Sequence, residues 1–143
     1  MIDAKVLLVD DEKAFVDTIA KRLEKRNLKI AKAFSGEQAL EHIQVHPKIE
    51  VVILDVKMPG MDGRAVLKEI KNNYPLIEVI MLTGHATIES GIEGMKSGAF
   101  DYLTKPCDID NLLAKVDEAA TKKRRHEEKI MEARLREITS RRA

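Results

Sequence analysis

Short apolar runs alternate with longer amphipathic stretches along most of the chain. The apolar runs predict five β-strands: Lys5–Val9, Lys29–Phe34, Val51–Leu54, Glu78–Leu82 and Phe100–Leu103. The stretches between and after them predict helices: Glu12–Arg26, a helix that opens at Ser35 and is ended by Pro47, Arg64–Asn72, Thr87–Met95, and a last helix that begins near Asp108. Such alternation is typical of parallel strands joined by crossover helices. We therefore expect an α/β fold, a doubly wound five-stranded parallel sheet with helices on both faces.

Local signals support several of these elements. Ser35, followed three residues later by Gln38, is a capping-box pattern and predicts a helix N-terminus. Val51–Leu54 consists of four consecutive apolar residues, as a strand covered on both faces requires. Gly91 and Gly94 each cost a helix about 1 kcal/mol relative to alanine. The helix that contains them is therefore predicted to be the softest.

Length and composition limit the domain count and the setting. A chain of 143 residues, 44% hydrophobic and 34% charged, suits one compact domain. A single Cys excludes an internal disulfide, and four widely spaced His do not suggest a zinc cluster. The apolar runs are too short to cross a bilayer, and no targeting segment is evident. We expect a cytoplasmic protein without a membrane partner.

The net charge of +1 conceals an asymmetry between body and tail. Residues 121–143 carry nine Lys/Arg and four Glu, whereas the residues before them have an excess of four acids. This shift predicts a domain at 1–120 and a basic helical extension or linker at 121–143, and the acidic body disfavours nucleic acid as its ligand. The tail has a thin apolar stripe: Ile130, Met131, Leu135 and Ile138. A solvated helix, a dimerising helix and a nucleic-acid contact all remain open for it.

Polar residues follow the predicted strands at the points where they end. Asp10 and Asp11 follow the first strand, Asp55 the third, Thr83 the fourth and Lys105 the fifth. Ligands of open α/β sheets bind beyond the carboxyl ends of the strands, so these side chains are expected to converge. Three clustered carboxylates with one ammonium form an oxygen-rich site suited to Mg²⁺.

Such a site favours phosphoryl chemistry. A carboxylate beside a metal can attack a phosphoryl group and form an aspartyl phosphate. A hydroxyl such as that of Thr83 and a cation such as Lys105 can then hold the phosphoryl oxygens and neutralise their charge.

With these residues in this order, the sequence resembles the receiver domain of a two-component response regulator. The resemblance covers Ala4–Ala120 and rests on four ordered motifs: Val9-Asp10-Asp11-Glu12, Leu54-Asp55 with Met58-Pro59-Gly60-Met61-Asp62-Gly63, Leu82-Thr83-Gly84-His85, and Asp101-Tyr102-Leu103-Thr104-Lys105-Pro106. The segment Gly98–Leu113 is similar to receivers of enhancer-binding, sigma-54-dependent (NtrC-like) transcription activators. A flavodoxin-like strand order, 2-1-3-4-5, is implied.

The resemblance also implies a role for each matched position. Asp55 is expected to accept the phosphoryl group, with Thr83 and Lys105 binding its oxygens. The expected Mg²⁺ ligands are Asp10, through water, Asp11, Asp55 and the backbone carbonyl of Lys57. The expected partner is a sensor histidine kinase, whose phosphohistidine donates the group; small acyl phosphates are alternative donors.

Switching is also implied by the resemblance. Tyr102 is expected to turn inward as Thr83 moves, changing the surface formed by the fourth helix, fifth strand and last helix. A homodimer through that surface or through the C-terminal helix is an expected assembly.

Three residues depart from the common pattern. Lys57 and His85 occupy positions that tune how long the phosphoryl group survives in such proteins, so the lifetime stays open. Cys107 stands where many relatives carry an aromatic residue, which affects the packing of that loop.

Two alternative functions fit the sequence less well. A phosphatase or phosphotransferase working through an aspartyl phosphate commonly has a second Asp two residues after the nucleophile, but here that residue is Lys57. We therefore expect no enzyme beyond the chain's own phosphorylation and dephosphorylation. A dinucleotide-binding module needs glycines after the first strand, where this chain has Asp10, Asp11 and Glu12.

Overall fold

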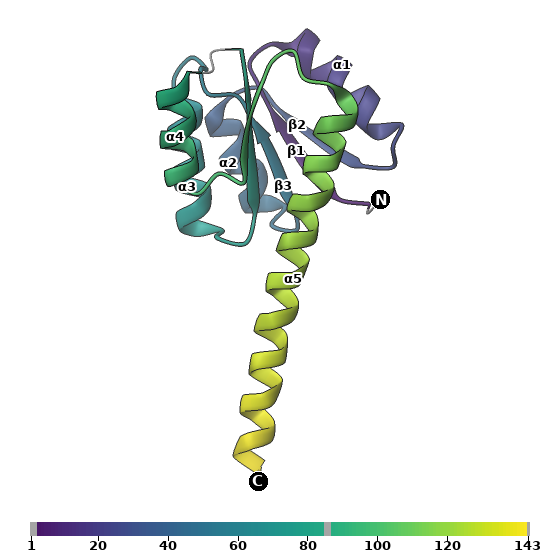
Figure 1. Cartoon of the computed structure of the whole chain (residues 1–143), viewed down its shortest axis with the longest axis vertical. Coiled ribbons are helices and arrows are strands. Elements are labelled where there is room, and N and C mark those ends of the chain that lie inside the picture. Colours follow the sequence, from purple (N-terminus) through teal and green to yellow (C-terminus); the bar gives the residue numbers. More distant parts are fainter. Residues whose placement is uncertain (1–2, 85–86, 143) are drawn as a thin grey trace.

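The computed structural model describes residues 3–84 and 87–142 (Figure 1). Strands and helices alternate from the first element to the last. In chain order they are β1 (Lys5–Val9), α1 (Lys13–Glu24), β2 (Lys29–Ala33), α2 (Gly36–Val45), β3 (Val51–Leu54), α3 (Gly63–Asn73), β4 (Glu78–Thr83), α4 (Ile88–Lys96), β5 (Asp101–Thr104) and α5 (Ile109–Arg142).

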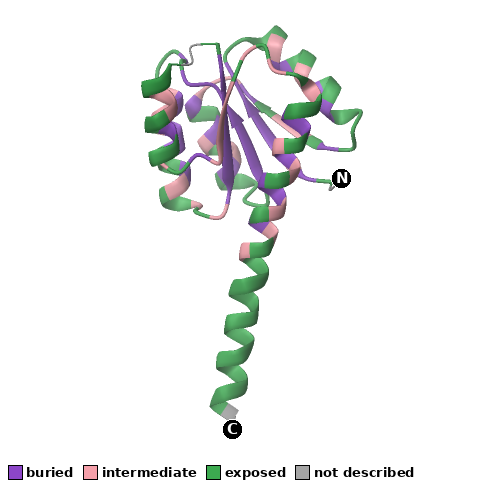
Figure 2. Ribbon diagram, viewed as in Figure 1, coloured by how far each residue is buried: buried purple, intermediate pink, exposed green. Residues whose placement is uncertain are grey.

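The strands form one parallel sheet in the order β2-β1-β3-β4-β5, which confirms the predicted fold class. Alternate residues of a strand point to opposite faces. In β1, Leu7 and Val9 pack in a core with residues of α2 and α3, whereas Val6 and Leu8 pack in a second core with residues of α1 and α5. Figure 2 shows the resulting buried strands between exposed helix surfaces.

Some element ends differ from the predicted ones. β2 ends at Ala33, and β5 lies one residue later than predicted. The Ser35 side chain accepts a hydrogen bond from the Gln38 amide at 3.1 Å, but the Gln38 side chain accepts from the amide of Phe34 at 2.9 Å and not from that of Ser35. The capping pattern thus identified the helix start although its second hydrogen bond is displaced by one residue.

α5 is one uninterrupted helix of 34 residues. It continues through residues 120 and 121, where the change in charge suggested a boundary. Its first part packs on the sheet and the remainder projects from the domain (Figures 1 and 2). Within residues 3–84 and 87–142, no helix is long and apolar enough to cross a membrane.

Ion pairs hold α5 where it leaves the sheet. Arg124 donates hydrogen bonds of 2.7 and 3.0 Å to the two carboxylate oxygens of Glu50, which directly precedes β3. Lys122 Nζ lies 2.8 Å from Glu78 Oε2 at the start of β4. Residues beyond position 120 therefore take part in the packed domain.

Candidate functional site

Three aspartates meet at the carboxyl edge of the sheet. Asp10 and Asp11 follow β1, Asp55 follows β3, and one carboxylate oxygen of each lies within 4.8 Å of the others. Asp10 and Asp55 are only 1% and 4% exposed, whereas Asp11 is exposed. They come together because β1 and β3 are neighbours that run in the same direction. The predicted convergence of these carboxylates is thus present in the structure.

Lys105 is the cation of this cluster. Its Nζ lies 2.5 Å from Asp10 Oδ2, 3.5 Å from Glu12 Oε1 and 3.8 Å from Asp55 Oδ2. The ammonium also lies 4.1 Å from the ring centroid of Phe15, in cation–π contact. Lys105 therefore pairs most closely with Asp10, and Asp55 keeps a looser contact.

The pKa values in the cluster reflect opposing influences. Burial raises the pKa of Asp10 above its ordinary value, although hydrogen bonds from Lys105 and from the amide of Glu12 act in the other direction. Burial alone would lower the pKa of Lys105, but the hydrogen bond to Asp10 and the charges of Asp10 and Asp55 outweigh it and raise that pKa. Lys105 therefore stays charged beside acids that repel one another.

Thr83 ends β4 beside the cluster and is fully buried. The amide of Lys105 donates a 2.9 Å hydrogen bond to the Thr83 carbonyl, and Thr83 is the register partner of Thr104. Because this pairing aligns the ends of β4 and β5, it places Thr83 and Lys105 next to each other. The Lys105–Pro106 peptide bond is cis.

The loop after Asp55 is held tightly against the start of α3. Val56 donates its amide to Asp55 Oδ1 at 2.8 Å, and Gly63 donates its amide to the Val56 carbonyl at 2.7 Å. A Cβ at Gly63 would lie 1.9 Å from the Asp55 carbonyl oxygen, so a side chain does not fit there. Gly60 has a φ of 77°, a conformation that favours glycine. These glycines allow the loop to orient Asp55.

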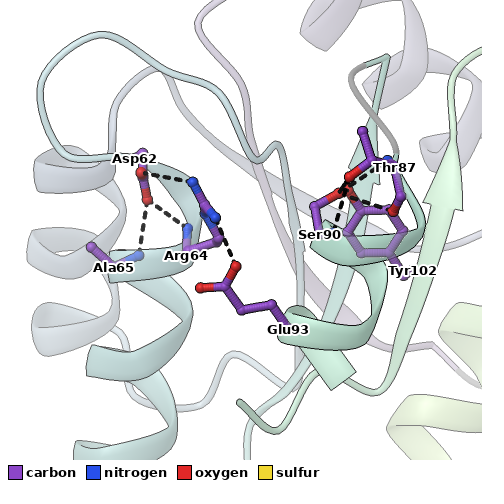
Figure 3. A network of polar contacts seen from close by, with 7 residues as sticks. All are labelled: Asp62, Arg64, Ala65, Thr87, Ser90, Glu93 and Tyr102. Atoms are coloured by element: carbon purple, nitrogen blue, oxygen red, sulfur yellow. Dashed lines mark hydrogen bonds and ion pairs between the residues drawn. The ribbon is translucent and has the colours of Figure 1, made fainter. Parts of the chain in front are cut away.

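Tyr102 faces α4 in this conformation. Its hydroxyl lies 2.7 Å from Ser90 Oγ (Figure 3). Its ring lies over Gly91 and Gly94, where an added Cβ would be 3.7 and 3.4 Å from ring atoms. A second link to α4 runs from Arg64 at the start of α3, whose guanidinium donates a 2.8 Å hydrogen bond to Glu93 (Figure 3). Polar contacts thus join α4 to α3 and to β5.

Sequence reasoning missed some residues that support the site. Asp62 is the N-cap of α3 and accepts hydrogen bonds from the amides of Arg64 and Ala65 at 2.9 and 3.1 Å. An Asp directly before a helix is a signal that could have identified this cap. The Ser90 contact with Tyr102 had no such signal, because it joins two elements through their tertiary packing.

The remaining predicted positions are placed as follows. Lys57 is exposed in the loop after Asp55, and Cys107 is a half-buried free thiol after Pro106. Burial is the main cause that raises the pKa of this thiol above its usual value, which keeps it protonated. His85 lies outside the described residues.

The arrangement suits a hard cation and an anionic group. Three carboxylate oxygens at this spacing, two of them on buried residues, match the oxygen ligands that Mg²⁺ takes in proteins. A hydroxyl and an ammonium at the same sheet edge are groups that can bind the oxygens of a phosphoryl group.

An open 2-1-3-4-5 parallel sheet, with clustered aspartates and a lysine at its carboxyl edge, defines the class of receiver domains, the regulatory phosphoacceptors of two-component systems. Residues 6–117 match the family described as the response regulator receiver domain, and the chain belongs to this family. Members of this class bind Mg²⁺ in an acidic pocket and are phosphorylated by sensor kinases.

Curated relatives show the same relationship. The chain is 40% identical over 114 residues to the transcriptional regulatory protein ZraR of Escherichia coli (strain K12), covering 80% of this chain and 26% of that protein. It is 37% identical over 112 residues to the DNA-binding transcriptional regulator NtrC of Klebsiella pneumoniae, covering 78% of this chain and 24% of that protein. These matches confirm the NtrC-like resemblance. The chain spans about a quarter of the length of these relatives.

Solved structures agree with the fold. A response regulator receiver domain protein from Clostridium thermocellum superposes with a TM-score of 0.81 at 37% identity, over 85% of this chain and 97% of that one. NtrX from Brucella abortus gives a TM-score of 0.81 at 32% identity, over 89% of this chain and 29% of that one.

Proposed function

We propose that Asp55 is the residue of this receiver that accepts the phosphoryl group, with the phosphohistidine of a sensor histidine kinase as donor. The observation that supports this proposal is the position of Asp55. It is buried, lies beside two other aspartates, and has Lys105 Nζ 3.8 Å from its Oδ2. Its Oδ1 already accepts the Val56 amide. Oδ2 is therefore the oxygen that attacks phosphorus as the donor's nitrogen–phosphorus bond breaks.

The surrounding residues prepare this attack. Lys105 lies near both Asp10 and Asp55, so its ammonium is available to an oxygen of a phosphoryl group on Asp55. Thr83, at the aligned end of β4, supplies a hydroxyl for a second oxygen. Both groups act by binding and neutralising charge on the transferred group.

The residues proposed to hold Mg²⁺ are Asp10, Asp11, Asp55 and the backbone carbonyl of Lys57. Their oxygen-rich chemistry fits the ion, and three clustered carboxylates beside the single ammonium of Lys105 leave a net negative charge for a cation to offset. When bound, the ion neutralises charge on the phosphoryl oxygens.

The structure-based support for a switch lies in α4. In this conformation Tyr102 is bonded to Ser90, and among residues of α4 only Gly94 is buried. We propose that phosphorylation draws Thr83 toward the site and Tyr102 inward, which breaks the Ser90 contact and shifts the α4–β5–α5 surface between two populated states.

We also propose that the chain works as a regulator without turnover of other substrates, and that residues 121–143 act as a basic helical extension to the receiver at 1–120. Exposed apolar residues support self-association, either through α4 or through the projecting part of α5: Ile88, Ile92, Met95, Ile130, Met131, Leu135 and Ile138. Light scattering of phosphorylated and unphosphorylated protein tests this. Self-association would be excluded if both the phosphorylated and the unphosphorylated protein were monomeric at high concentration.

The phosphoacceptor is tested by incubating the full chain with Mg²⁺ and acetyl phosphate and measuring its intact mass. One added phosphoryl group is expected, and none in Asp55→Asn or when EDTA replaces Mg²⁺. Asp110→Asn, an exposed acid on α5, is the matched control and should be labelled like the parent. Continued labelling of Asp55→Asn would contradict the assignment.

A further inference from the structure

A groove lies at the opposite end of the strands from the acidic cluster. It has a volume of about 400 Å³ and is formed by the starts of β1 and β2, the end of α2 and the loop that follows. Its apolar lining includes Ala31, Val45 and Ile49. Val45 is 71% exposed although it is a large apolar residue. The groove therefore offers apolar surface beside β2, one of the two edge strands of the sheet (Figure 1).

Three lysines surround this apolar surface: Lys5, Lys29 and Lys48. Lys5 and Lys29 are register partners in the parallel β1–β2 pair, so their side chains leave the same face of neighbouring strands about 4.8 Å apart. Across the described part of the chain, none of the three ammonium groups forms an ion pair. Glu50 lies close by, but its carboxylate is bound by Arg124 and by the backbone amide of Lys5.

The remaining wall is formed by two imidazoles. The ring centroids of His42 and His46 lie 4.6 Å apart. Burial is the main cause that lowers the pKa of His42, and the neighbouring His46 lowers it further. The His42 ring is therefore neutral near pH 7 and adds little charge to the groove. The positive charge is therefore concentrated at the lysine side.

We propose that this groove binds a small amphiphilic anion, a carboxylate attached to an apolar body of about seven to nine carbon atoms. Cavities of this size are typical of small-molecule sites, which are mostly apolar with a few polar groups that fix orientation. The carboxylate lies between Lys5 and Lys29, because the C-terminal end of α2 carries partial negative charge and repels an anion. The apolar body lies along Ala31, Val45 and Ile49, on the sheet face that Lys5 and Lys29 share. Such a site, remote from Asp55, would give the receiver a second chemical input.

Octanoate is the probe that tests the proposal, and 1-octanol is its uncharged counterpart of the same length. Nuclear magnetic resonance spectra of the ¹⁵N-labelled full chain are recorded during each titration. Octanoate is expected to shift the amide signals of residues 29–31 and 42–49 in a saturable manner, and 1-octanol to bind at least fivefold more weakly. Equal affinity for the two probes, or shifts confined to other surfaces, would overturn the proposal.

Variants test the charge and the apolar wall separately. Lys29→Ala is expected to weaken octanoate binding about two- to fivefold, as for one exposed ion pair. Lys96→Ala, at the end of α4, is the matched control and should have no effect. Val45→Glu places a carboxylate at an exposed position of the groove and should abolish binding while the spectrum remains that of a folded domain. Unchanged affinity in both Lys29→Ala and Val45→Glu would refute the site.

Discussion

Replacing Asp55 with Asn should stabilise the metal-free domain, although it removes the proposed phosphoacceptor. Oxygens of Asp10, Asp11 and Asp55 lie within 4.8 Å of one another, and the compensating contact from Lys105 to Asp55 measures 3.8 Å. Asparagine keeps an oxygen that can accept the Val56 amide, so the local hydrogen bond is retained. The substitution therefore changes mainly the charge.

The magnitude follows from these distances. At an effective dielectric constant of about 20, each repulsion of Asp55 by a neighbouring aspartate amounts to roughly 3.5 kcal/mol and the attraction to Lys105 to roughly 4.4 kcal/mol. Two repulsions exceed one attraction by about 2–3 kcal/mol, and solvent around the exposed Asp11 reduces the difference. We expect the free energy of unfolding of Asp55→Asn to exceed that of the parent by about 1–2 kcal/mol.

Urea unfolding followed by circular dichroism, in EDTA, measures this difference. The slope with urea should be unchanged, because the surface exposed on unfolding is the same. Asp110→Asn serves as the control: its exposed carboxylate pairs with Arg26 at 3.3 Å, so its loss should lower stability slightly or leave it unchanged. Mg²⁺ should stabilise the parent by mass action and Asp55→Asn much less. If Asp55→Asn is less stable than the parent in EDTA, the electrostatic reasoning is wrong.

Three further results are expected. Glu50→Gln should lower the free energy of unfolding by about 1–3 kcal/mol, because it weakens the hydrogen bonds from Arg124. Burial alone would raise the pKa of Glu50, but Arg124 lowers this pKa overall. The stabilisation is therefore present above pH 4.5 and lost on acidification, which unfolding at several pH values will show. Asp10 should stabilise the metal-free protein as the pH falls toward 3.8, because its pKa is raised in the folded state and its carboxylate therefore binds a proton there before it does in the unfolded chain. Calorimetry that detects no proton uptake on folding in this pH range would contradict this. Gly63→Ala should cost about 1–3 kcal/mol or more in urea unfolding because its Cβ would lie 1.9 Å from a carbonyl oxygen, whereas Gly84→Ala, with nothing within 4 Å, should cost far less.

Much of the fold could be predicted because its determinants are local. The apolar run at Val51–Leu54 and the cap at Ser35 are short-range patterns, and each corresponds to an observed element. β5 was misplaced by one residue because a four-residue edge strand with no buried residues has a weak apolar pattern. Its bounds depend on pairing with β4.

The composition of the site could also be predicted from the sequence, but its internal pairing could not. Parallel strands bring their carboxyl ends to one edge, so residues that follow separate strands can be assigned to one cluster from the sequence. The pairing inside the cluster could not be assigned in this way. That Lys105 lies closer to Asp10 than to Asp55 depends on side-chain conformation and on the register of β4 with β5.

The sequence by itself determined the alternation of elements, the parallel sheet and the group of acids at its edge, because periodicity and strand ends are properties of neighbouring residues. Only the tertiary structure decided how α5 leaves the domain, through Glu50 and Arg124, which are 74 residues apart. It also decided that Lys5 and Lys29 stand side by side, with neither ammonium group in an ion pair among the residues that the structure describes. Contacts between distant residues depend on strand register and helix placement, which no short stretch of sequence encodes.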